Sequence, residues 1–274
     1  MRFVTYNVHY GQGRDGRFDL DRIAAAVDGA DVIALQEVER FWPRSGHTDQ
    51  VQTLAKLLPE HWWVYGPNID LASPMGFPGE AADRRRQFGN MLLSRWPIAS
   101  SRNVPLPRGA RVGRTMQRGA LEGIVDAPSG PLRVYSTHFD YRSADTRALQ
   151  FEMLSSWLAA ADPADAPWAG DHPDGADGWL VGDEPPIPQR AVVMGDLNIA
   201  ANSAEYDRTL GASSGLHDAW VLAGGARDVE SKHGSGRIDH VLVTAGLTGA
   251  VRRVWIDDAA AGSDHQPLWA DLEL

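Results

Sequence analysis

Residues 191–198 read Ala191-Val192-Val193-Met194-Gly195-Asp196-Leu197-Asn198, a continuous apolar run that leads into a glycine, an acid and an amide. An unbroken apolar run of this kind is typical of a strand that is buried on both faces. The stretch Val32-Ile33-Ala34-Leu35 repeats the pattern and leads into Gln36-Glu37. Because doubly buried strands need further layers to cover them, these stretches predict an α/β fold whose sheets are covered by helices.

The rest of the chain alternates between strand-like and helical patterns. Strands are expected at 2–6, 31–36, 62–65, 88–94, 119–126, 131–138, 191–195, 238–243, 249–256 and 267–273. Helices are expected from Asp19 or Asp21 to about Asp28, from Thr48 or Asp49 until Pro59, after Ser143, and in a short segment near 203–210. Since the chain has no internal repeat and no linker long enough to separate two domains, we expect residues 1–274 to form a single domain.

One segment, at about 162–189, departs from these patterns. It holds six Pro, four Gly and seven acids, and it has no apolar periodicity. This composition predicts a long surface insertion. It is either a disordered loop or a lid near a functional site, and in the second case Trp168 and Trp179 are the candidate contacts.

The overall composition bounds the class of protein. With 274 residues, 43% hydrophobic residues and ten Trp, the chain can bury a large core. No apolar stretch approaches the roughly 18 residues of a membrane span, and the chain enters a strand at Arg2, so we expect neither a transmembrane segment nor a signal peptide. The absence of Cys excludes disulfides and thiolate metal sites, and it is the composition expected of a cytoplasmic protein.

Charge is segregated along the sequence. The net charge of −10 argues against a broadly basic nucleic-acid surface. However, the segment from Arg84 to Arg118 carries nine Arg and no acid, whereas the segment from Asp162 to Glu184 carries seven acids and no Lys or Arg. The basic segment is either a solvated face or an anion-binding rim.

Polar residues at the ends of predicted strands are candidates for chemistry. Asn7 and Glu37 each follow a strand, and a carboxylate with an amide oxygen suits a hard cation such as Mg²⁺. Taken singly, Asn7 is a turn residue and Glu37 a surface acid. Asp196 and Asn198 can orient a water and contact phosphate, although their Gly-Asp-Leu-Asn sequence also fits an Asx turn.

Two histidines have acids in a suitable context. His265 follows Asp264, and a His with an acid partner can stabilise or protonate charge on a phosphoryl oxygen. Asp239 lies within an apolar strand, where an acid needs a partner, and His265 is a candidate for that role. His138 ends another predicted strand and is the second candidate.

Six such motifs occur in one order across the chain: Thr5-Tyr6-Asn7, Leu35-Gln36-Glu37-Val38, Ser136-Thr137-His138-Phe139-Asp140, Met194-Gly195-Asp196-Leu197-Asn198, Arg237-Ile238-Asp239-His240 and Ser263-Asp264-His265-Gln266-Pro267. Together they resemble the endonuclease/exonuclease/phosphatase superfamily, the deoxyribonuclease I-like metal-dependent phosphoesterases. Further family blocks are similar to Gly89–Arg95, to Arg118–Leu121, and to Arg147 with Gln150. The resemblance implies a four-layer α/β sandwich, in which two mixed β-sheets pack face to face and are flanked by helices.

The resemblance also implies roles for individual residues. Glu37 is the expected principal Mg²⁺ ligand, with Mn²⁺ as a substitute metal, and Asn7 and Asp264 complete the expected metal group. The expected catalytic residues are Asp196 for the attacking water, Asn198 and His138 for the phosphate, and His265 oriented by Asp239. The expected substrate-binding residues are Asn90, Arg118 and Arg147.

The function implied is a Mg²⁺-dependent, nuclease-like hydrolase that cleaves a phosphoester, foremost a phosphodiester, by in-line attack of an activated water. The partner is then a phosphoester substrate, with nucleic acid among the candidates, and the sequence indicates no protein partner. The alternative is a sphingomyelinase-like or inositol-phosphatase-like hydrolase, for which Pro74–Pro78 could offer a small apolar patch. A non-catalytic binding module is disfavoured because the expected catalytic residues are all present.

Overall fold

The computed structural model describes residues 1–72, 84–109, 115–159, 187–210 and 215–274. Two six-stranded sheets form its centre. The first has the strand order β11-β12-β1-β2-β4-β3, and the second has the order β5-β6-β7-β8-β10-β9. Both are mixed, since β1 pairs with β2 and β7 pairs with β8 in parallel, while the other neighbours run antiparallel.

The strands of the first sheet are β1 (Arg2–Asn7), β2 (Val32–Arg40), β3 (Trp62–Leu71), β4 (Arg86–Ser94), β11 (Val251–Ile256) and β12 (Leu268–Leu272). Those of the second are β5 (Ile98–Pro105), β6 (Gly119–Val125), β7 (Leu132–His138), β8 (Ala191–Asp196), β9 (Leu216–Asp218) and β10 (Asp239–Thr244). The helices are α1 (Leu20–Ala26), α2 (Gln50–Leu57), α3 (Ala144–Ala159), α4 (Ala204–Thr209) and α5 (Ala219–Leu222). Short 3₁₀ turns lie at His9–Gly11, Pro43–Ser45 and Ala245–Ala250.

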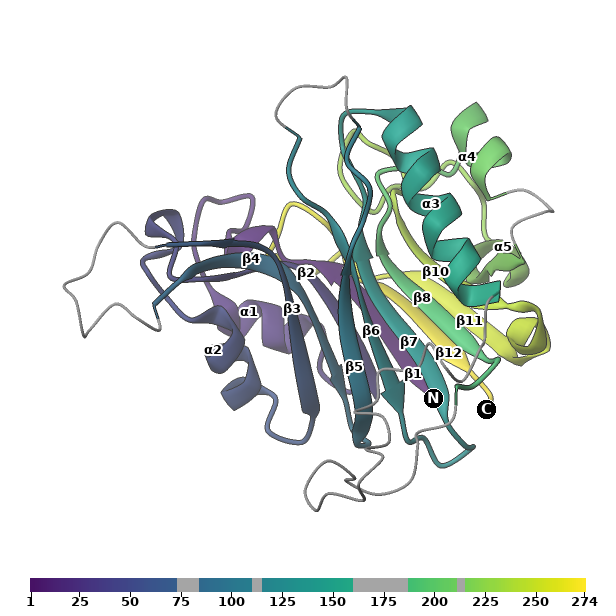
Figure 1. The fold of residues 1–274 in the computed structure, drawn as a ribbon, viewed down its shortest axis with the longest axis horizontal. Helices are drawn as coiled ribbons and strands as arrows, with labels where there is room; N and C mark the ends of the chain where they lie inside the picture. Colours follow the sequence, from purple (N-terminus) through teal and green to yellow (C-terminus); the bar gives the residue numbers. More distant parts are fainter. Residues whose placement is uncertain (73–83, 110–114, 160–186, 211–214) are drawn as a thin grey trace, which may run out of the picture.

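Three apolar clusters hold four layers together. The central cluster joins the facing sides of the two sheets, with Phe3 and Leu92 from the first and Val134 and Met194 from the second. A second cluster packs α1 and α2 onto the first sheet, and a third packs α3 and α4 onto the second. The helices consequently flank the paired sheets on opposite sides (Figure 1). The predicted four-layer sandwich is confirmed.

Local sequence explains where the helices begin. The side chains of Asp19 and Asp49 accept hydrogen bonds from the first turns of α1 and α2, as the capping pattern predicted, and Ser203 caps α4 in the same way. Two strands and one helix were not predicted. Strand β5 is polar and ends at Pro105 on a sheet edge, where proline is tolerated, while β9 and α5 span only three and four residues.

The predicted insertion at 162–189 falls outside the described residues except for 187–189, as do Trp168, Trp179 and Pro74–Pro78. Among the helices that the structure describes, none combines the length and the apolar character needed to cross a bilayer.

The two parallel pairs bring the candidate residues to one edge. In the first sheet Asn7 lies opposite Gln36, and in the second His138 lies opposite Asp196. Gly195 permits this second pairing, because a Cβ at that position would lie 1.9 Å from the carbonyl oxygen of Thr137. The carboxyl ends of the four strands therefore face one another across the sandwich.

Candidate active site

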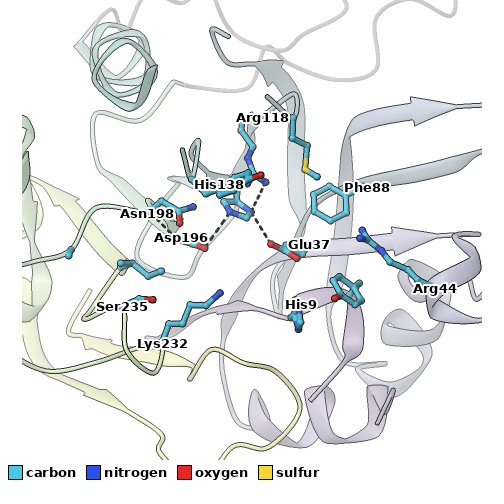
Figure 2. A pocket seen from close by; sticks show the side chains of 15 residues that line it. His9, Glu37, Arg44, Phe88, Arg118, His138, Asp196, Asn198, Lys232 and Ser235 are labelled. Atoms are coloured by element: carbon cyan, nitrogen blue, oxygen red, sulfur yellow. Dashed lines mark hydrogen bonds and ion pairs between the residues drawn. The ribbon is translucent and has the colours of Figure 1, made fainter. Parts of the chain in front are cut away.

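A cavity of about 500 Å³ opens where these strand ends meet (Figure 2). Its walls come from both sheets and from the loops that follow them. It is lined by His9, Tyr10, Glu37, Arg44, Phe88, Met116, Arg118, His138, Tyr141, Asp196, Asn198, Ala200, Lys232, Ser235 and Ile238. Five of the residues expected from the sequence are among them: Glu37, Arg118, His138, Asp196 and Asn198.

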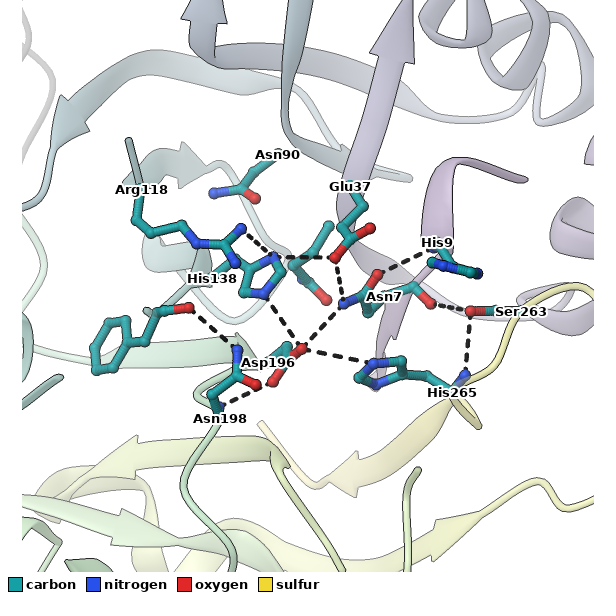
Figure 3. A network of polar contacts seen from close by, with 12 residues as sticks. Asn7, His9, Glu37, Asn90, Arg118, His138, Asp196, Asn198, Ser263 and His265 are labelled. Carbon is teal, nitrogen blue, oxygen red and sulfur yellow. Dashed lines mark hydrogen bonds and ion pairs between the residues drawn. The ribbon is translucent and has the colours of Figure 1, made fainter. Parts of the chain in front are cut away.

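A β-bulge aims Glu37 into the cavity. The pairing of β2 with β4 shifts register between Leu35 and Val38, and Glu37 has φ 61°, a left-handed conformation that is uncommon for a residue other than glycine. Nδ2 of Asn7 donates to Glu37 Oε1 at 3.3 Å and to Asp196 Oδ2 at 3.0 Å, while its Oδ1 accepts from the backbone N of His9 (Figure 3). Asn7 thus bridges the two carboxylates through its amino group.

His138 is held as a neutral imidazole. Nη1 of Arg118 donates to His138 Nδ1 at 3.1 Å, so the ring proton resides on Nε2, which lies 3.3 Å from Asp196 Oδ2. Burial, followed by the charge of Arg118, lowers the pKa of His138 well below its usual value. The neutral ring can therefore orient Asp196 without neutralising it.

His265 forms a buried pair with Asp239. Its Nδ1 lies 2.9 Å from Asp239 Oδ2, which also accepts from the Ser231 hydroxyl at 2.6 Å. Its Nε2 lies 3.6 Å from Asp196 Oδ2. Burial alone would lower the pKa of His265, but the charges of Asp239 and Asp196 outweigh it and raise the pKa to about 9. His265 therefore carries a proton at neutral pH.

Asp196 lies between the two histidines. Its burial raises the pKa to about 6, against the opposing effect of the charge on His265. The Asp196 carboxylate thus faces a neutral imidazole, His138, at 3.3 Å and an imidazolium, His265, at 3.6 Å. Groups whose environments separate their pKa values in this way can act as base and acid in one reaction.

The comparisons with known proteins agree with this geometry. Residues 4–265 match the model of the Endonuclease/Exonuclease/phosphatase family. The chain belongs to this family. It is a phosphoesterase of that superfamily, whose members hydrolyse phosphoester bonds.

Solved structures of this family have the same fold. An endonuclease/exonuclease/phosphatase from Beutenbergia cavernae is 26% identical, with a TM-score of 0.70 over 100% of this chain and 71% of that one. A mannosyl-6-phosphatase from Bacteroides thetaiotaomicron is 16% identical, with a TM-score of 0.65 over 100% of both chains. TDP2 from D. rerio, complexed with a single-strand DNA product, is 16% identical, with a TM-score of 0.65 over 100% of this chain and 99% of that one. No curated protein matches the chain by sequence.

The oxygen atoms at the centre of the family site suit a divalent cation. Glu37 and Asp196 each place one carboxylate oxygen within 3.3 Å of the same Asn7 nitrogen, so the two oxygens converge. Hard cations such as Mg²⁺ select such oxygen ligands. Asp196, Asp239 and His265 also bring ligand atoms within 4.8 Å of one another. In that second group the hydrogen bond between His265 and Asp239 already engages two members.

Asp264 is engaged by Lys232 and His9. Its Oδ2 accepts from Lys232 Nζ at 2.8 Å, and its Oδ1 lies 3.6 Å from His9 Nδ1. Burial would raise the pKa of Asp264, but the hydrogen bond from Lys232 lowers it. The 3.1 Å contact between Lys232 Nζ and His265 Nε2 is a hydrogen bond only when that imidazole is neutral. With carboxylates on both sides, His265 is the proton carrier, and Lys232 is held by Asp264.

The predicted substrate-binding residues are not all in the cavity. Arg118 lines it, is 3% exposed, and has a buried Nε for which the described part of the chain offers no partner. Asn90 lies behind the cavity, where its Nδ2 donates to the carbonyls of Gly119 and Ser136. Asn198 lines the cavity and also forms the Asx turn, since its backbone N donates to Asp196 Oδ1 at 2.9 Å.

Arg147 does not reach the cavity. Its Nε and Nη2 each donate to the carboxylate of Glu205 at 2.7 Å, and its Nη1 donates to the carbonyl of Asp140. This bidentate pairing uses the guanidinium within the protein, tying α3 to α4. Arg85 and Arg86 are not among the residues that line the cavity: Arg85 bonds to Asp70, while Arg86 bonds to the carbonyl of Ala72 and lies over the Trp42 ring.

Several cavity residues were not expected from the sequence. Tyr10 and Arg44 lie in the short turns after β1 and β2, and Lys232 lies in the loop before β10. Lys232 enters through isolated bridges to Gly236 and His265. Because these segments have no periodicity, only the charge of Arg44 and Lys232 could have drawn attention to them.

Proposed function

We propose that the chain is a Mg²⁺-dependent phosphodiesterase in which an activated water attacks phosphorus in line with the leaving oxygen. The observation that carries the proposal is an unbroken series of contacts. It runs from Glu37 through Asn7 to Asp196, and from Asp196 to His138 and to the His265–Asp239 pair. Phosphoryl transfer relies on positioning and on charge stabilisation, and this series supplies groups for both.

Glu37 would hold the metal, and Asp196 lies beside it as the base, since both carboxylates accept from the Asn7 amino group. A bound Mg²⁺ would polarise a phosphoryl oxygen and offset charge that develops in the transition state. Asn7 keeps the two carboxylates in register by donating to both of them.

The protein's own groups divide the remaining work. Asp196, with its pKa raised to about 6, orients the attacking water and accepts its proton. The protonated His265 donates to a phosphoryl oxygen, and Asp239 fixes its orientation through Nδ1. Arg118, buried on the cavity wall, offers further donors to the phosphate.

The test is hydrolysis of bis-p-nitrophenyl phosphate by the purified protein with and without Mg²⁺. Glu37→Gln should remove most of the Mg²⁺-dependent activity and leave the fold intact, because it deletes a charge at a partly exposed bulge. Glu60→Gln is the matched control, since Glu60 is exposed and pairs with Arg95 at the surface. Full activity of Glu37→Gln at limiting Mg²⁺ would exclude Glu37 as a metal ligand.

A second candidate function is hydrolysis of a small phosphoester, such as a phosphorylated metabolite. The observation that favours it is the distribution of cations. Among the described residues, the Lys and Arg that line the cavity are Arg44, Arg118 and Lys232, whereas Arg84–Arg86 lie outside its lining. Structures with this fold include both a mannosyl-6-phosphatase and a protein bound to a DNA product, so the fold itself accommodates either.

Salt dependence separates the two candidates. A polynucleotide substrate should show affinity that falls with salt at a log–log slope near −0.9 for each duplex phosphate neutralised, whereas a small phosphoester should show a shallow slope. Replacing Arg84, Arg85 and Arg86 together with Ala and titrating duplex DNA against salt reports on the basic segment. An unchanged slope would remove this segment from the substrate site and favour the small phosphoester.

A further inference from the structure

We propose that the end of the cavity beyond Glu37 is a subsite for the leaving group, and that it takes a leaving group with a flat aromatic ring, such as a nucleobase or an aryl group. The inference rests on the proposed phosphoesterase function. The subsite is formed by Tyr10, Arg44 and Phe88, with Trp42 behind them. We refer to these four residues as the arginine–aromatic wall.

Arg44 is packed among three rings. Its guanidinium carbon lies 4.2 Å from the ring centroid of Tyr10, 5.2 Å from that of Trp42 and 5.9 Å from that of Phe88. Guanidinium planes and aromatic faces both stack on planar rings. Tyr10, Arg44 and Phe88 line the same cavity as Glu37. One substrate can therefore place its ring against these residues and its phosphate beside Glu37.

The charge of Arg44 is already balanced. Its guanidinium bonds to Glu39, whose side chain is fully buried and also accepts from the Ser45 hydroxyl at 2.8 Å. An arginine that is neutralised in this way is a weak partner for a second phosphate. By contrast, the guanidinium of Arg118 is buried, and among the described residues no carboxylate is hydrogen-bonded to it. The arginine–aromatic wall therefore selects a flat uncharged group. The reacting phosphate binds near the other cations of the cavity lining, Arg118 and Lys232.

The backbone conformation that positions Tyr10 within the arginine–aromatic wall has an energetic cost. His9 and Tyr10 have φ of 45° and 46°, a left-handed conformation that bulky residues avoid. Gln50 fixes this turn, because its Nε2 donates to the Tyr10 carbonyl at 2.6 Å while its Oε1 accepts from the backbone N of Glu39. Such strain persists where the surroundings over-determine it, and it clusters at ligand sites.

The direction of the reaction assigns the wall to the leaving group. Figure 2 shows Glu37 between Asp196 and Asn198 on one side and Arg44 and Phe88 on the other. In an in-line displacement the attacking water and the leaving oxygen lie on opposite sides of phosphorus. Since Asp196 is the group that activates water, the leaving group points past Glu37 toward the wall.

The test is a binding measurement that requires no turnover. Benzylphosphonate and cyclohexylmethylphosphonate carry the same phosphonate and rings of similar size, but only the first ring is aromatic. Isothermal titration of the wild-type protein in Mg²⁺ should give about three- to tenfold tighter binding of benzylphosphonate. Tyr10→Phe should keep this ratio, and Tyr10→Leu should bring it to about one. Phe88→Leu, which retains an apolar side chain, should lower the ratio independently.

Equal affinities in the wild-type protein would overturn the subsite, as would a ratio that is unchanged in both leucine variants. Hydrolysis of bis-p-nitrophenyl phosphate, measured on the same samples, separates this result from the proposed function. A protein that hydrolyses the ester with equal phosphonate affinities keeps the function and loses the subsite. A protein that prefers benzylphosphonate and releases no product keeps the ring subsite and loses the function.

Discussion

Two buried acid–histidine pairs lie beside strand β10, and they differ in what surrounds the imidazole. Asp239 holds His265 at 2.9 Å, and the far nitrogen of that ring lies 3.6 Å from Asp196 and 3.1 Å from Lys232, which both line the cavity. Asp218 lies 3.4 Å from His240, whose far nitrogen instead donates to the carbonyl of Ile199 at 2.8 Å. We call the first pair, whose far nitrogen contacts residues that line the cavity, the open pair, and we call the second the closed pair.

Arg237 explains the closed pair. Its Nη2 donates to Asp218 at 2.7 Å, and its Nη1 lies 2.9 Å from His240 Nδ1. Arg237 cannot lose its proton, so it balances Asp218 permanently. In the open pair the charge that balances Asp239 is carried by the titratable His265. The comparison teaches that, under the proposed function, the open pair leaves an imidazole nitrogen for the reaction and the closed pair does not.

The largest expected difference between the pairs is in turnover. His265→Ala should lower kcat by about 10²–10⁴-fold, because it removes the proton donor that faces the phosphate. His240→Ala should leave the kcat of the folded protein near the wild-type value. The measurement is saturating hydrolysis of bis-p-nitrophenyl phosphate, with the folded fraction determined by near-ultraviolet circular dichroism. A comparable loss of kcat in both variants would abolish the distinction.

Stability should show the opposite order. Asp218→Asn should lower the free energy of unfolding by about 3–5 kcal/mol, because it leaves Arg237 buried without its counter-charge. Asp239→Asn should lower it less, since His265 can release its proton when its partner is gone. Urea denaturation of both variants at neutral pH compares the two. The interpretation is wrong if Asp239→Asn proves the more destabilising.

The two pairs should also lose their contributions to the free energy of unfolding at opposite ends of the pH range. The pKa of folded His265, about 9, lies above the unfolded value of about 6.5, so its stabilisation is complete below about pH 6.5 and is lost as the pH rises toward 9. The loss should be on the order of 3 kcal/mol. Urea denaturation of the wild-type protein from pH 6.5 to 9 should show it, and His265→Ala should abolish this part of the slope.

The stabilisation that Asp218 contributes depends on pH in the opposite direction. Burial alone would raise its pKa, yet the contacts with His240 and Arg237 hold the pKa well below the usual range. Its stabilisation is therefore present above the unfolded pKa of about 3.9 and is lost as the pH falls below it. Below pH 4, the free energy of unfolding should fall less steeply with decreasing pH in Asp218→Asn than in the wild-type protein. Equal acid slopes would show that Asp218 is not the responsible group.

The sequence predicted the fold well because the fold depends on local patterns. Runs such as Val192–Met194 are buried strands, and Asp19 and Asp49 cap helices where expected. Strand β5 escaped because its residues Ser100–Asn103 are polar, and its place comes from pairing with β6 rather than from its own sequence.

The site was predictable only where function lies at strand ends. Glu37, His138 and Asp196 end or interrupt strands, so sheet geometry brings them together. The pairing of acids with histidines was partly predictable. Asp239 was expected to need a partner, and it pairs with His265 as proposed, although its neighbour in sequence is His240. Asp264 precedes His265 in sequence but bonds to Lys232. Motif resemblance likewise could not reveal that Arg147 pairs with Glu205, 58 residues further along the chain.

The smallest expected effects come from removing the hydroxyl group that donates to the acid of each pair. Tyr206 donates to Asp218 at 2.7 Å, and Ser231 donates to Asp239 at 2.6 Å. Tyr206→Phe and Ser231→Ala should each lower the free energy of unfolding by about 1 kcal/mol, the typical contribution of one hydrogen bond. Only Ser231→Ala should slow turnover, by about fivefold, because the same energy then acts on the orientation of His265. If Tyr206→Phe slows turnover equally, the closed pair is coupled to the cavity and the two pairs form a single network.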